Sequence, residues 1–268
     1  MKRIIAIIVT VIIIAVDILA FMGLFITDKT PVYGTEAIAL PEMPYSPSDR
    51  PAKSVPEIPY EYSMPVPESR SVDNDFFDKC VFIGDSRMLG LVRYTDVSPV
   101  NYCSVGFSVA AYDTSKFVRV DGEVYTISEA LRKNDDYTAV YIGTGLNELG
   151  WSLGRFKSKY AEMLDDIKEC AGERPVYIQL IMPMTTEFET SKKMNPFGLK
   201  NENVHTFNEA LIELAVEKNV YYIDCSEPFV LEDGTLNPEK SSDGAHLTLE
   251  AYAEQLEYYK NHVAEFYK

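Results

Sequence analysis

The chain has 268 residues, of which 46% are hydrophobic, and its 25 Lys and Arg against 41 Asp and Glu give a formal net charge of −16. A chain of this length and apolar content can fill a folded core, which excludes a wholly disordered protein. The acidic charge argues against nucleic acid as a partner, because affinity for a polyphosphate comes largely from Lys and Arg side chains that replace condensed counterions. The four cysteines include no C-x-x-C pair, which excludes a zinc ribbon or a thioredoxin-type site.

An apolar run from Ile4 to Ile26 follows the basic residues Lys2 and Arg3. As a helix with a rise of about 1.5 Å per residue, this run reaches about 35 Å and can cross a hydrocarbon core of about 30 Å. Cations before the run and few after it favour a cytoplasmic N-terminus. We therefore expect residues 1–26 to be a single membrane anchor with the rest of the chain outside the cytoplasm. The alternative is a cleaved signal peptide, which would give a secreted protein.

A proline-rich segment follows the apolar run. Nine of the fifteen prolines fall between Pro31 and Pro67. Proline at this density blocks helices and central strands and favours extended, solvated backbone. We expect residues 27–75 to form an extracytoplasmic stalk and residues 76–268 to form one folded domain.

The predicted domain alternates between short β-rich runs and segments with helical spacing of apolar residues, such as 156–167, 204–214 and 249–263. Continuous apolar strands followed by amphipathic helices indicate a parallel sheet covered on both faces. We therefore expect an α/β fold, a three-layer α/β/α sandwich, with one β-hairpin at Phe117–Thr126 around Asp121-Gly122. The five predicted strands of the sheet are Cys80–Gly84, Val100–Ser104, Ala139–Gly143, Val176–Met182 and Val220–Asp224.

Candidate functional residues follow these strands, at the edge where parallel sheets bind ligands. Ser86 comes after the first strand, where a helix begins, so it is either a nucleophile with a free backbone N–H or a helix N-cap. Gly106 follows the second strand and lets a ligand approach the backbone, and Asn147 follows the third and carries an amide donor. Two such donors beside Ser86 would form an oxyanion hole, although Gly and Asn are also ordinary turn residues.

Asp243 and His246 lie three residues apart, before the last predicted helix. In a turn, such a carboxylate can accept a hydrogen bond from imidazole Nδ1 and leave Nε2 to take a proton from a serine. The pair is a weak signal alone, but all these residues belong to carboxyl-end loops of one predicted sheet. No cluster of His, Cys and carboxylate residues has the spacing of metal ligands, so we expect neither a metal nor a cofactor.

The ordered motifs resemble the sequence blocks of the SGNH (GDSL) hydrolases, and the resemblance covers residues 76–268. The matching residues are Gly84-Asp85-Ser86, Gly106, Gly145-x-Asn147 and Asp243-x-x-His246. The resemblance implies a flavodoxin-like fold in which Ser86 is the nucleophile, His246 the general base and acid, and Asp243 its orienting partner. It also implies an oxyanion hole made by the backbone N–H groups of Ser86 and Gly106 and the side chain of Asn147.

Two residues depart from the family's pattern, since Arg87 stands where the family usually has Leu and Glu148 where it usually has Asp. We expect Arg87 and Trp151, the only tryptophan, to contact the substrate. The long segment 183–200 should lie on the rim of the site, where specificity loops are common. Its mixture of Met, Phe and Lys suits a carbohydrate or an amphiphilic ester.

The sequence therefore predicts a serine esterase that acts through a covalent acyl-enzyme. The anchor and stalk suggest an acyl ester, above all an O-acetyl ester, on a cell-envelope polysaccharide. Two alternatives remain open. The first is an O-acyltransferase that uses the same triad with a sugar hydroxyl as acceptor, and the second is an inactive binding module, with Arg87 or Glu148 as the cause.

The other histidines and the cysteines are expected to be structural. His205 and His262 lie in predicted amphipathic helices. Cys80, Cys103 and Cys225 lie on or beside predicted strands, where thiols pack as small hydrophobic groups. A disulfide remains open in an exported protein.

Overall fold

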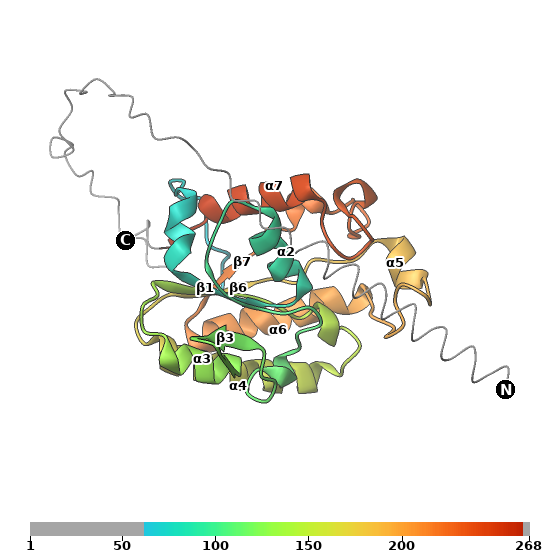
Figure 1. Ribbon diagram of the computed structural model, residues 1–268. Helices are drawn as coiled ribbons and strands as arrows, with labels where there is room; N and C mark the ends of the chain where they lie inside the picture. The colour runs from blue at the N-terminus through green and yellow to red at the C-terminus, as the bar shows by residue number, and fades with distance from the viewer. Residues whose placement is uncertain (1–61, 265–268) are drawn as a thin grey trace, which may run out of the picture. The chain divides into compact units, whose positions relative to one another are not determined.

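The computed structural model describes residues 62–264 (Figure 1). The predicted anchor at residues 1–26 and most of the predicted stalk lie outside the described residues. Within residues 62–264, no helix is both long enough and apolar enough to span a membrane.

A five-stranded parallel sheet forms the centre of the domain, with the strand order β2-β1-β5-β6-β7. Its strands are β1 (Cys80–Gly84), β2 (Val100–Cys103), β5 (Ala139–Gly143), β6 (Val176–Gln179) and β7 (Tyr221–Ile223). In register, Ile83 of β1 lies opposite Ile142 of β5, which lies opposite Ile178 of β6. Every residue of β1 and β5 is buried, as expected for central strands with helices on both faces. The predicted parallel sheet is confirmed.

Helices cover both faces of this sheet, which gives three layers (Figure 1). One face carries α2 (Ser86–Tyr94) and α7 (Leu249–Lys260), and the other carries α3 (Ile127–Lys133), α4 (Leu153–Ala171) and α6 (Glu202–Lys218). Side chains alternate along each strand, so Phe82 and Tyr141 pack beneath α2 and α7, whereas Ile83 and Ile142 pack beneath the other three helices. The remaining helical segments are α5 (Thr186–Thr190) and the 3-10 helices η2 (Asn74–Lys79), η3 (Val109–Ala111), η4 (Leu146–Glu148), η5 (Glu227–Phe229) and η6 (Pro238–Lys240).

The predicted β-hairpin is also confirmed. Strands β3 (Val118–Val120) and β4 (Glu123–Tyr125) pair in antiparallel fashion. Asp121 and Gly122 connect them with φ angles of 51° and 85°. A two-residue turn of type I′ requires positive φ at both positions, which explains the Asp-Gly pair.

The fourth strand is shorter than the sequence pattern predicts, because β6 ends at Gln179 rather than at Met182. Leu180 still donates to the carbonyl of Ile223 in β7 at 2.9 Å, and from Ile181 a side chain holds the backbone in place of a neighbouring strand. Asn208 of α6 accepts a hydrogen bond from the Ile181 N–H at 2.8 Å and donates one to the Ile181 carbonyl at 2.9 Å. The chain therefore leaves the sheet early and continues along its carboxyl edge.

The folded domain begins before residue 76, where the sequence pattern placed the end of the stalk. Val66 and Val72 are only 1% and 7% exposed. The Val66 N–H donates to the Tyr222 carbonyl at 2.9 Å, and the Val72 N–H donates to the Lys260 carbonyl at 3.0 Å. Two buried valines and these hydrogen bonds make this segment part of the domain in spite of its prolines.

The C-terminal helix α7 ends at Lys260, so His262 lies beyond it rather than within it as predicted. The His262 ring stacks on Tyr258, with ring centroids 3.7 Å apart. His205 lies in α6, as predicted, and its side chain is exposed. All four cysteines lie within the described residues as free thiols, so none of them forms a disulfide.

Candidate active site

Ser86 is the first residue of α2, and Asp85 alone separates it from the end of β1 at Gly84. The N-cap of this helix is Asp85, whose side chain accepts a hydrogen bond from the Arg87 N–H at 2.9 Å. The capping role is therefore filled by Asp85, which leaves the Ser86 hydroxyl available for another contact. The Ser86 N–H belongs to the first turn of α2, where backbone N–H groups have no partner within the helix.

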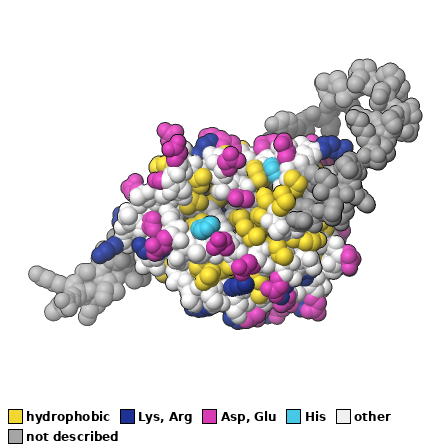
Figure 2. Space-filling view, turned by 180° about the vertical axis from the view of Figure 1, so that it is seen from behind, with side chains coloured by type: hydrophobic (Ala, Val, Ile, Leu, Met, Phe, Trp, Pro, Cys, Tyr) yellow, Lys and Arg dark blue, Asp and Glu magenta, His cyan; other side chains and the backbone are white. Residues whose placement is uncertain are grey.

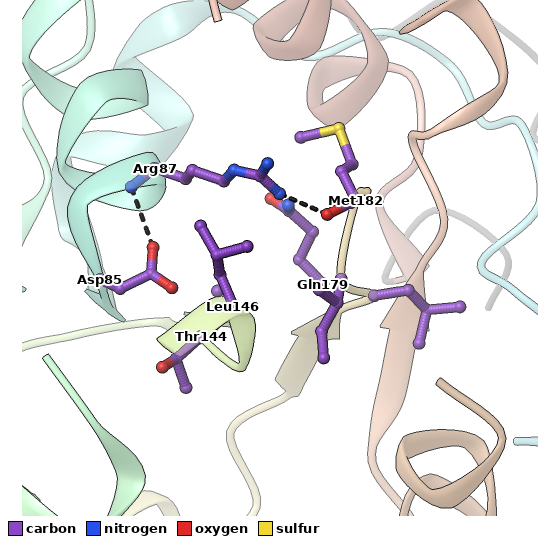
Figure 3. Close-up of a pocket in the computed structure, with 9 residues that line it drawn as sticks. Asp85, Arg87, Thr144, Leu146, Gln179 and Met182 are labelled. Carbon is purple, nitrogen blue, oxygen red and sulfur yellow. Dashed lines mark hydrogen bonds between the residues drawn. The ribbon is translucent and has the colours of Figure 1, made fainter. Parts of the chain in front are cut away.

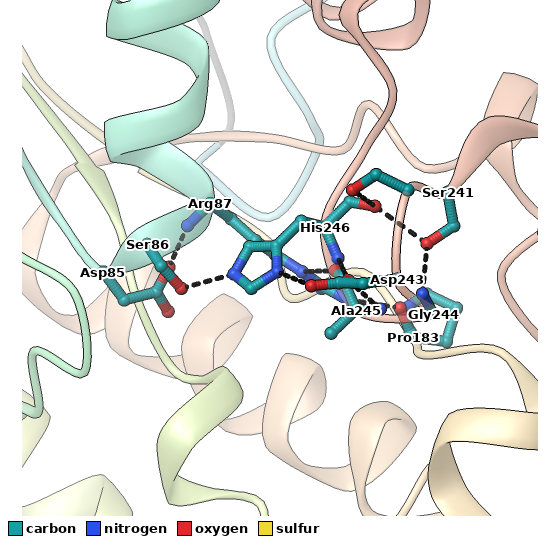
Figure 4. Close-up of polar contacts among 10 residues, drawn as sticks. Asp85, Ser86, Arg87, Pro183, Ser241, Asp243, Gly244, Ala245 and His246 are labelled. Atoms are coloured by element: carbon teal, nitrogen blue, oxygen red, sulfur yellow. Dashed lines mark hydrogen bonds and ion pairs between the residues drawn. The ribbon is translucent and has the colours of Figure 1, made fainter. Parts of the chain in front are cut away.

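The structure brings Ser86, His246 and Asp243 together (Figure 4). The Oγ atom of Ser86 lies 2.8 Å from Nε2 of His246, across 160 positions of sequence. The Nδ1 atom of the same ring lies 2.7 Å from Oδ2 of Asp243. A serine, an imidazole and a carboxylate joined in this order form the hydrogen-bonded chain of a nucleophilic triad.

The Asp243 carboxylate is held in its ionised form. Partial burial alone would raise its pKa, but hydrogen bonds from the His246 ring and from the backbone N–H groups of His246 and Ala245 outweigh this effect and hold the pKa well below its usual range. An ionised carboxylate favours the imidazole tautomer with a proton on Nδ1. The Nε2 atom is then free to accept the proton of the Ser86 hydroxyl.

The loop that carries Asp243 and His246 is fixed by its own hydrogen bonds. Ser241 Oγ donates to the His246 carbonyl and accepts from the Gly244 N–H, both at 2.8 Å. Gly244 has a φ of 89°, and a Cβ there would lie 2.7 Å from the Thr185 hydroxyl oxygen. The close approach and the positive φ both require glycine at this position.

The two residues predicted for the oxyanion hole lie on neighbouring loops of the same sheet edge. Gly106 follows β2, has a φ of 70° and is exposed, whereas Asn147 lies in η4 after β5. Asn147 Nδ2 donates to the carbonyl of Phe107 at 2.8 Å, so the amide is tied to the Gly106 loop. The amide nitrogen carries two hydrogens, and the second one can donate a hydrogen bond to a ligand. Their role as oxyanion donors stays a prediction.

Glu148 holds this same pair of loops together. Its side chain is 0% exposed, and Oε1 accepts the Val109 N–H at 3.0 Å. Burial raises the pKa of the carboxyl to about 7, against the hydrogen bonds from Ser108 and Val109 that favour the ionised form. Glu148, which stands where the family usually has Asp, is therefore a buried carboxyl that links η4 to η3 beside Asn147.

Replacing Glu148 by Gln is expected to change how stability depends on pH. The carboxyl has a pKa of about 7 in the folded chain against an ordinary value of 4.5. As the pH rises, the unfolded chain releases this proton first, so the free energy of unfolding falls between about pH 4.5 and pH 7. The difference between these two pKa values corresponds to a fall of about 3 kcal/mol in the free energy of unfolding.

Glutamine keeps an oxygen for the Val109 N–H but does not titrate. Thermal unfolding of both proteins at pH 5 and pH 8 checks this prediction. Relative to the wild type, Glu148→Gln should gain up to about 3 kcal/mol on going to the higher pH. Parallel pH profiles for the two proteins would contradict the assignment.

The sequence predicts that Arg87 contacts the substrate, but the structure places this side chain inside the protein. Its side chain is buried, with the residue only 5% exposed. The guanidinium donates to three backbone carbonyls, those of Ala245 at 2.6 Å, Pro183 at 2.7 Å and Met182. Because its guanidinium is buried and bound to the backbone of its own chain, Arg87 does not line the open site.

Trp151 lies after η4 and is half-buried against the core. The guanidinium of Arg155 lies 3.8 Å from the centre of its ring, which is a cation–π geometry. A contact between Trp151 and the substrate stays a prediction. A Cβ on Gly150 would lie 3.5 Å from the carbonyl oxygen of Phe197, so the segment 183–200 borders the Trp151 loop.

The surroundings of the triad combine polar and apolar side chains. A cavity of about 210 Å³ lies beside Asp243, between the segment 183–200 and the Ser241–Gly244 loop, and Thr185, Ser241 and Ser242 are among the residues that line it. Phe197 in the segment 183–200 is 85% exposed. Figure 2 shows one face of the molecule, on which hydrophobic patches lie among acidic side chains and a histidine. Among residues 62–264, no group of three His, Cys, Asp or Glu side chains is arranged to hold a metal ion.

Comparison with known proteins identifies a family that the chain matches. The model of the GDSL-like Lipase/Acylhydrolase family matches residues 83–254. No curated protein matches the chain.

Solved structures share the fold at low sequence identity. A protein assigned as a platelet activating factor from Streptococcus pneumonia is 19% identical, with a TM-score of 0.54, and the similarity covers 71% of this chain and 84% of that chain. A protein assigned as an acylhydrolase from Bacteroides fragilis NCTC 9343 is 14% identical, with a TM-score of 0.54 and coverage of 76% and 92%. A protein assigned to the lipolytic G-D-S-L family from Desulfitobacterium hafniense DCB-2 is 17% identical, with a TM-score of 0.50 and coverage of 69% and 99%.

Proposed function

This chain belongs to the GDSL-like lipase/acylhydrolase family of carboxylic ester hydrolases, and on that premise we propose that Ser86 attacks the ester carbonyl to form a covalent acyl-enzyme. The observation that carries this proposal is the continuous contact from Ser86 Oγ to His246 Nε2 at 2.8 Å and from His246 Nδ1 to Asp243 Oδ2 at 2.7 Å. In this arrangement the imidazole takes the hydroxyl proton as the new C–O bond forms, and Asp243 stabilises the resulting imidazolium.

The tetrahedral intermediate carries a negative oxygen that needs hydrogen-bond donors. The proposed donors are the backbone N–H groups of Ser86 and Gly106 and the amide of Asn147. The Ser86 N–H also lies at the positive end of the α2 dipole, which favours an anion. Preorganised donors of this kind are worth about 10²–10³-fold in kcat each.

Collapse of the intermediate completes the first half of the reaction. His246 gives its proton from Nε2 to the leaving alcohol, and the acyl group stays on Ser86. Water then enters, and His246 accepts its proton as the water oxygen attacks the acyl carbon. Collapse of this second tetrahedral intermediate breaks the bond to Ser86 Oγ and releases the acid, and His246 returns its proton to the serine oxygen. The two halves use the same three side chains in the same positions.

For the substrate, the proposal is an O-acetyl ester on a cell-envelope carbohydrate, hydrolysed outside the cytoplasm. The location rests on the sequence of residues 1–26 and of the proline-rich segment alone. The polar residues Thr185, Ser241 and Ser242 line the cavity beside Asp243, and this polar lining supports a polyhydroxylated leaving group. Exposed Phe197 adds an apolar surface that can pack against the flat side of a sugar ring.

The test measures release of acetate from acetylated wall polymer by the full chain, together with any acetylated sugar formed when an acceptor sugar is added. A series of p-nitrophenyl esters from acetyl to longer acyl chains is measured in parallel. We expect acetate release from the polymer and a preference for the acetyl ester of at least about tenfold over an eight-carbon chain, roughly the discrimination that hydrophobic contacts provide. Activity confined to long-chain lipid esters would overturn the substrate proposal, and acetate found only on the acceptor would make the protein a transferase.

A further inference from the structure

Arg87 links the helix of the nucleophile to two distant segments, the chain beyond β6 (Figure 3) and the loop that carries His246 (Figure 4). It is the second residue of α2, and its side chain crosses to the chain beyond β6, where it donates to the carbonyls of Met182 and Pro183. Its Nε atom donates to the carbonyl of Ala245, 158 positions away in sequence. The Arg87 side chain therefore joins three segments: α2, the chain after β6 and the loop that carries His246.

The contact with Ala245 acts directly on the peptide unit that carries His246 (Figure 4). The carbonyl of this planar unit accepts from Arg87 Nε at 2.6 Å, while its N–H donates to Asp243 Oδ1 at 2.8 Å. The unit is thus held on both sides, and its rotation would move the imidazole relative to Ser86 Oγ.

The buried guanidinium of Arg87 lies in the electrostatic field of a buried carboxyl, that of Asp85. Asp85 is 2% exposed and lines, with Arg87, a cavity of about 20 Å³ at the carboxyl edge of the sheet. Burial lowers the pKa of Arg87 and raises that of Asp85, and the opposite charge of each residue acts against the shift of the other. Burying a guanidinium is costly, and the three hydrogen bonds to backbone carbonyls offset part of that cost.

Shorter or apolar residues cannot make the same contacts. Leu or Met would fill the space but leave three buried carbonyls without their donor, at a cost of about 1–3 kcal/mol for each unsatisfied group. Lys carries a single nitrogen and lacks the planar fork that reaches several acceptors in fixed directions.

We infer that Arg87 is a positioning residue that fixes the His246–Asp243 loop against the nucleophile's helix, and so sets the distance between His246 and Ser86. This inference rests on the proposed function. It makes Arg87 a part of the active site that does not touch the substrate.

The test compares wild type, Arg87→Met, Arg87→Lys and Arg93→Met in the full chain. Arg93 lies on the same helix, its side chain is exposed, and its replacement removes the same charge. Each protein is measured for kcat and KM with p-nitrophenyl acetate and for its rate of labelling by a fluorophosphonate. All rates are expressed per active site and recorded well below the unfolding temperature.

For Arg87→Met we expect kcat and the labelling rate to fall by about 10²-fold, with KM changed by less than about threefold, because a displacement of about 1 Å of a catalytic group has an effect of this size. Arg87→Lys should lose about tenfold, and Arg93→Met should match the wild type. A purely structural residue would lower the unfolding temperature and leave the rate per active site unchanged, which would overturn the inference.

If Arg87→Met does not fold, Arg87→Lys decides, and an unchanged labelling rate in that variant overturns the inference. Failure of the proposed function gives a different result. A wild type that does not react with the fluorophosphonate would remove Ser86 as nucleophile. A labelled wild type with equally fast Arg87 variants would remove only the positioning role.

Discussion

Replacing Ser86 by alanine is expected to lower kcat for ester hydrolysis by about 10⁶-fold, the size of effect that follows removal of a nucleophilic serine. The hydroxyl is the only group of Ser86 that contacts His246, at 2.8 Å, and alanine offers nothing for the imidazole to activate. The oxyanion donors remain in place, so a small residual rate over water is expected. The measurement is hydrolysis of p-nitrophenyl acetate, with covalent labelling by a fluorophosphonate.

The Ser86→Ala protein should fold normally. Asp85, rather than Ser86, caps α2, and alanine is the best helix former. The unfolding temperature is therefore expected to stay within a few degrees of the wild type. Ser158→Ala, an exposed serine in α4, provides the matched control and should keep full activity. Persistent labelling of Ser86→Ala would show that another residue is the nucleophile.

The central sheet could be predicted from sequence because its signal is local and periodic. Buried strands such as Cys80–Gly84 and Ala139–Gly143 are continuous apolar runs, and each is bounded by residues that break the pattern. Parallel strands then place the residues after each of them at one edge, so the sequence alone predicts that Ser86 and Asn147 belong to one site.

The role of Arg87 could not be predicted in this way. Its partners Met182, Pro183 and Ala245 lie 95, 96 and 158 positions away, and all of them use backbone carbonyls, which carry no side-chain signal. A charged residue at the start of a helix is normally exposed, so the sequence predicts that Arg87 contacts the substrate rather than the backbone of its own chain.

The same limitation applies to buried acids and to segment boundaries. Glu148 is fully buried, although glutamate is among the residues most often exposed, and only the packing of η3 against η4 creates its site. Residues 62–75 have the composition of a stalk and most of them are exposed, yet the buried side chains of Val66 and Val72 attach the segment to the domain. Composition describes an average, whereas burial depends on a few side chains that find a matching surface.

Replacing Asp243 by asparagine is expected to lower kcat by about 10⁴-fold with little change in structure. The backbone N–H groups of Ala245 and His246 both donate to Oδ1, at 2.9 Å and 2.8 Å. In Asp243→Asn these two donors hold the amide oxygen at that position, so the NH₂ group takes the place of Oδ2 and points at Nδ1 of the ring.

An NH₂ group at that position selects the wrong tautomer. Nδ1 must then accept a hydrogen bond, which places the ring proton on Nε2, opposite the Ser86 hydroxyl. The imidazole cannot take the serine proton in this form, even though Ser86 and His246 keep their contact distance. The loss therefore appears in kcat and in the rate of fluorophosphonate labelling, whereas KM changes little.

Asp233→Asn is the matched control, because the Asp233 carboxylate also accepts hydrogen bonds within its own turn, from Thr235, but faces no histidine in the structure of residues 62–264. Its kcat should remain within about twofold of the wild type, the size expected of an exposed residue away from the site. A kcat of Asp243→Asn within tenfold of the wild type would mean that the imidazole keeps its working tautomer without the carboxylate. Catalysis would then depend on Ser86 and His246 alone, and the short contact between Asp243 and the ring would serve only to hold the loop.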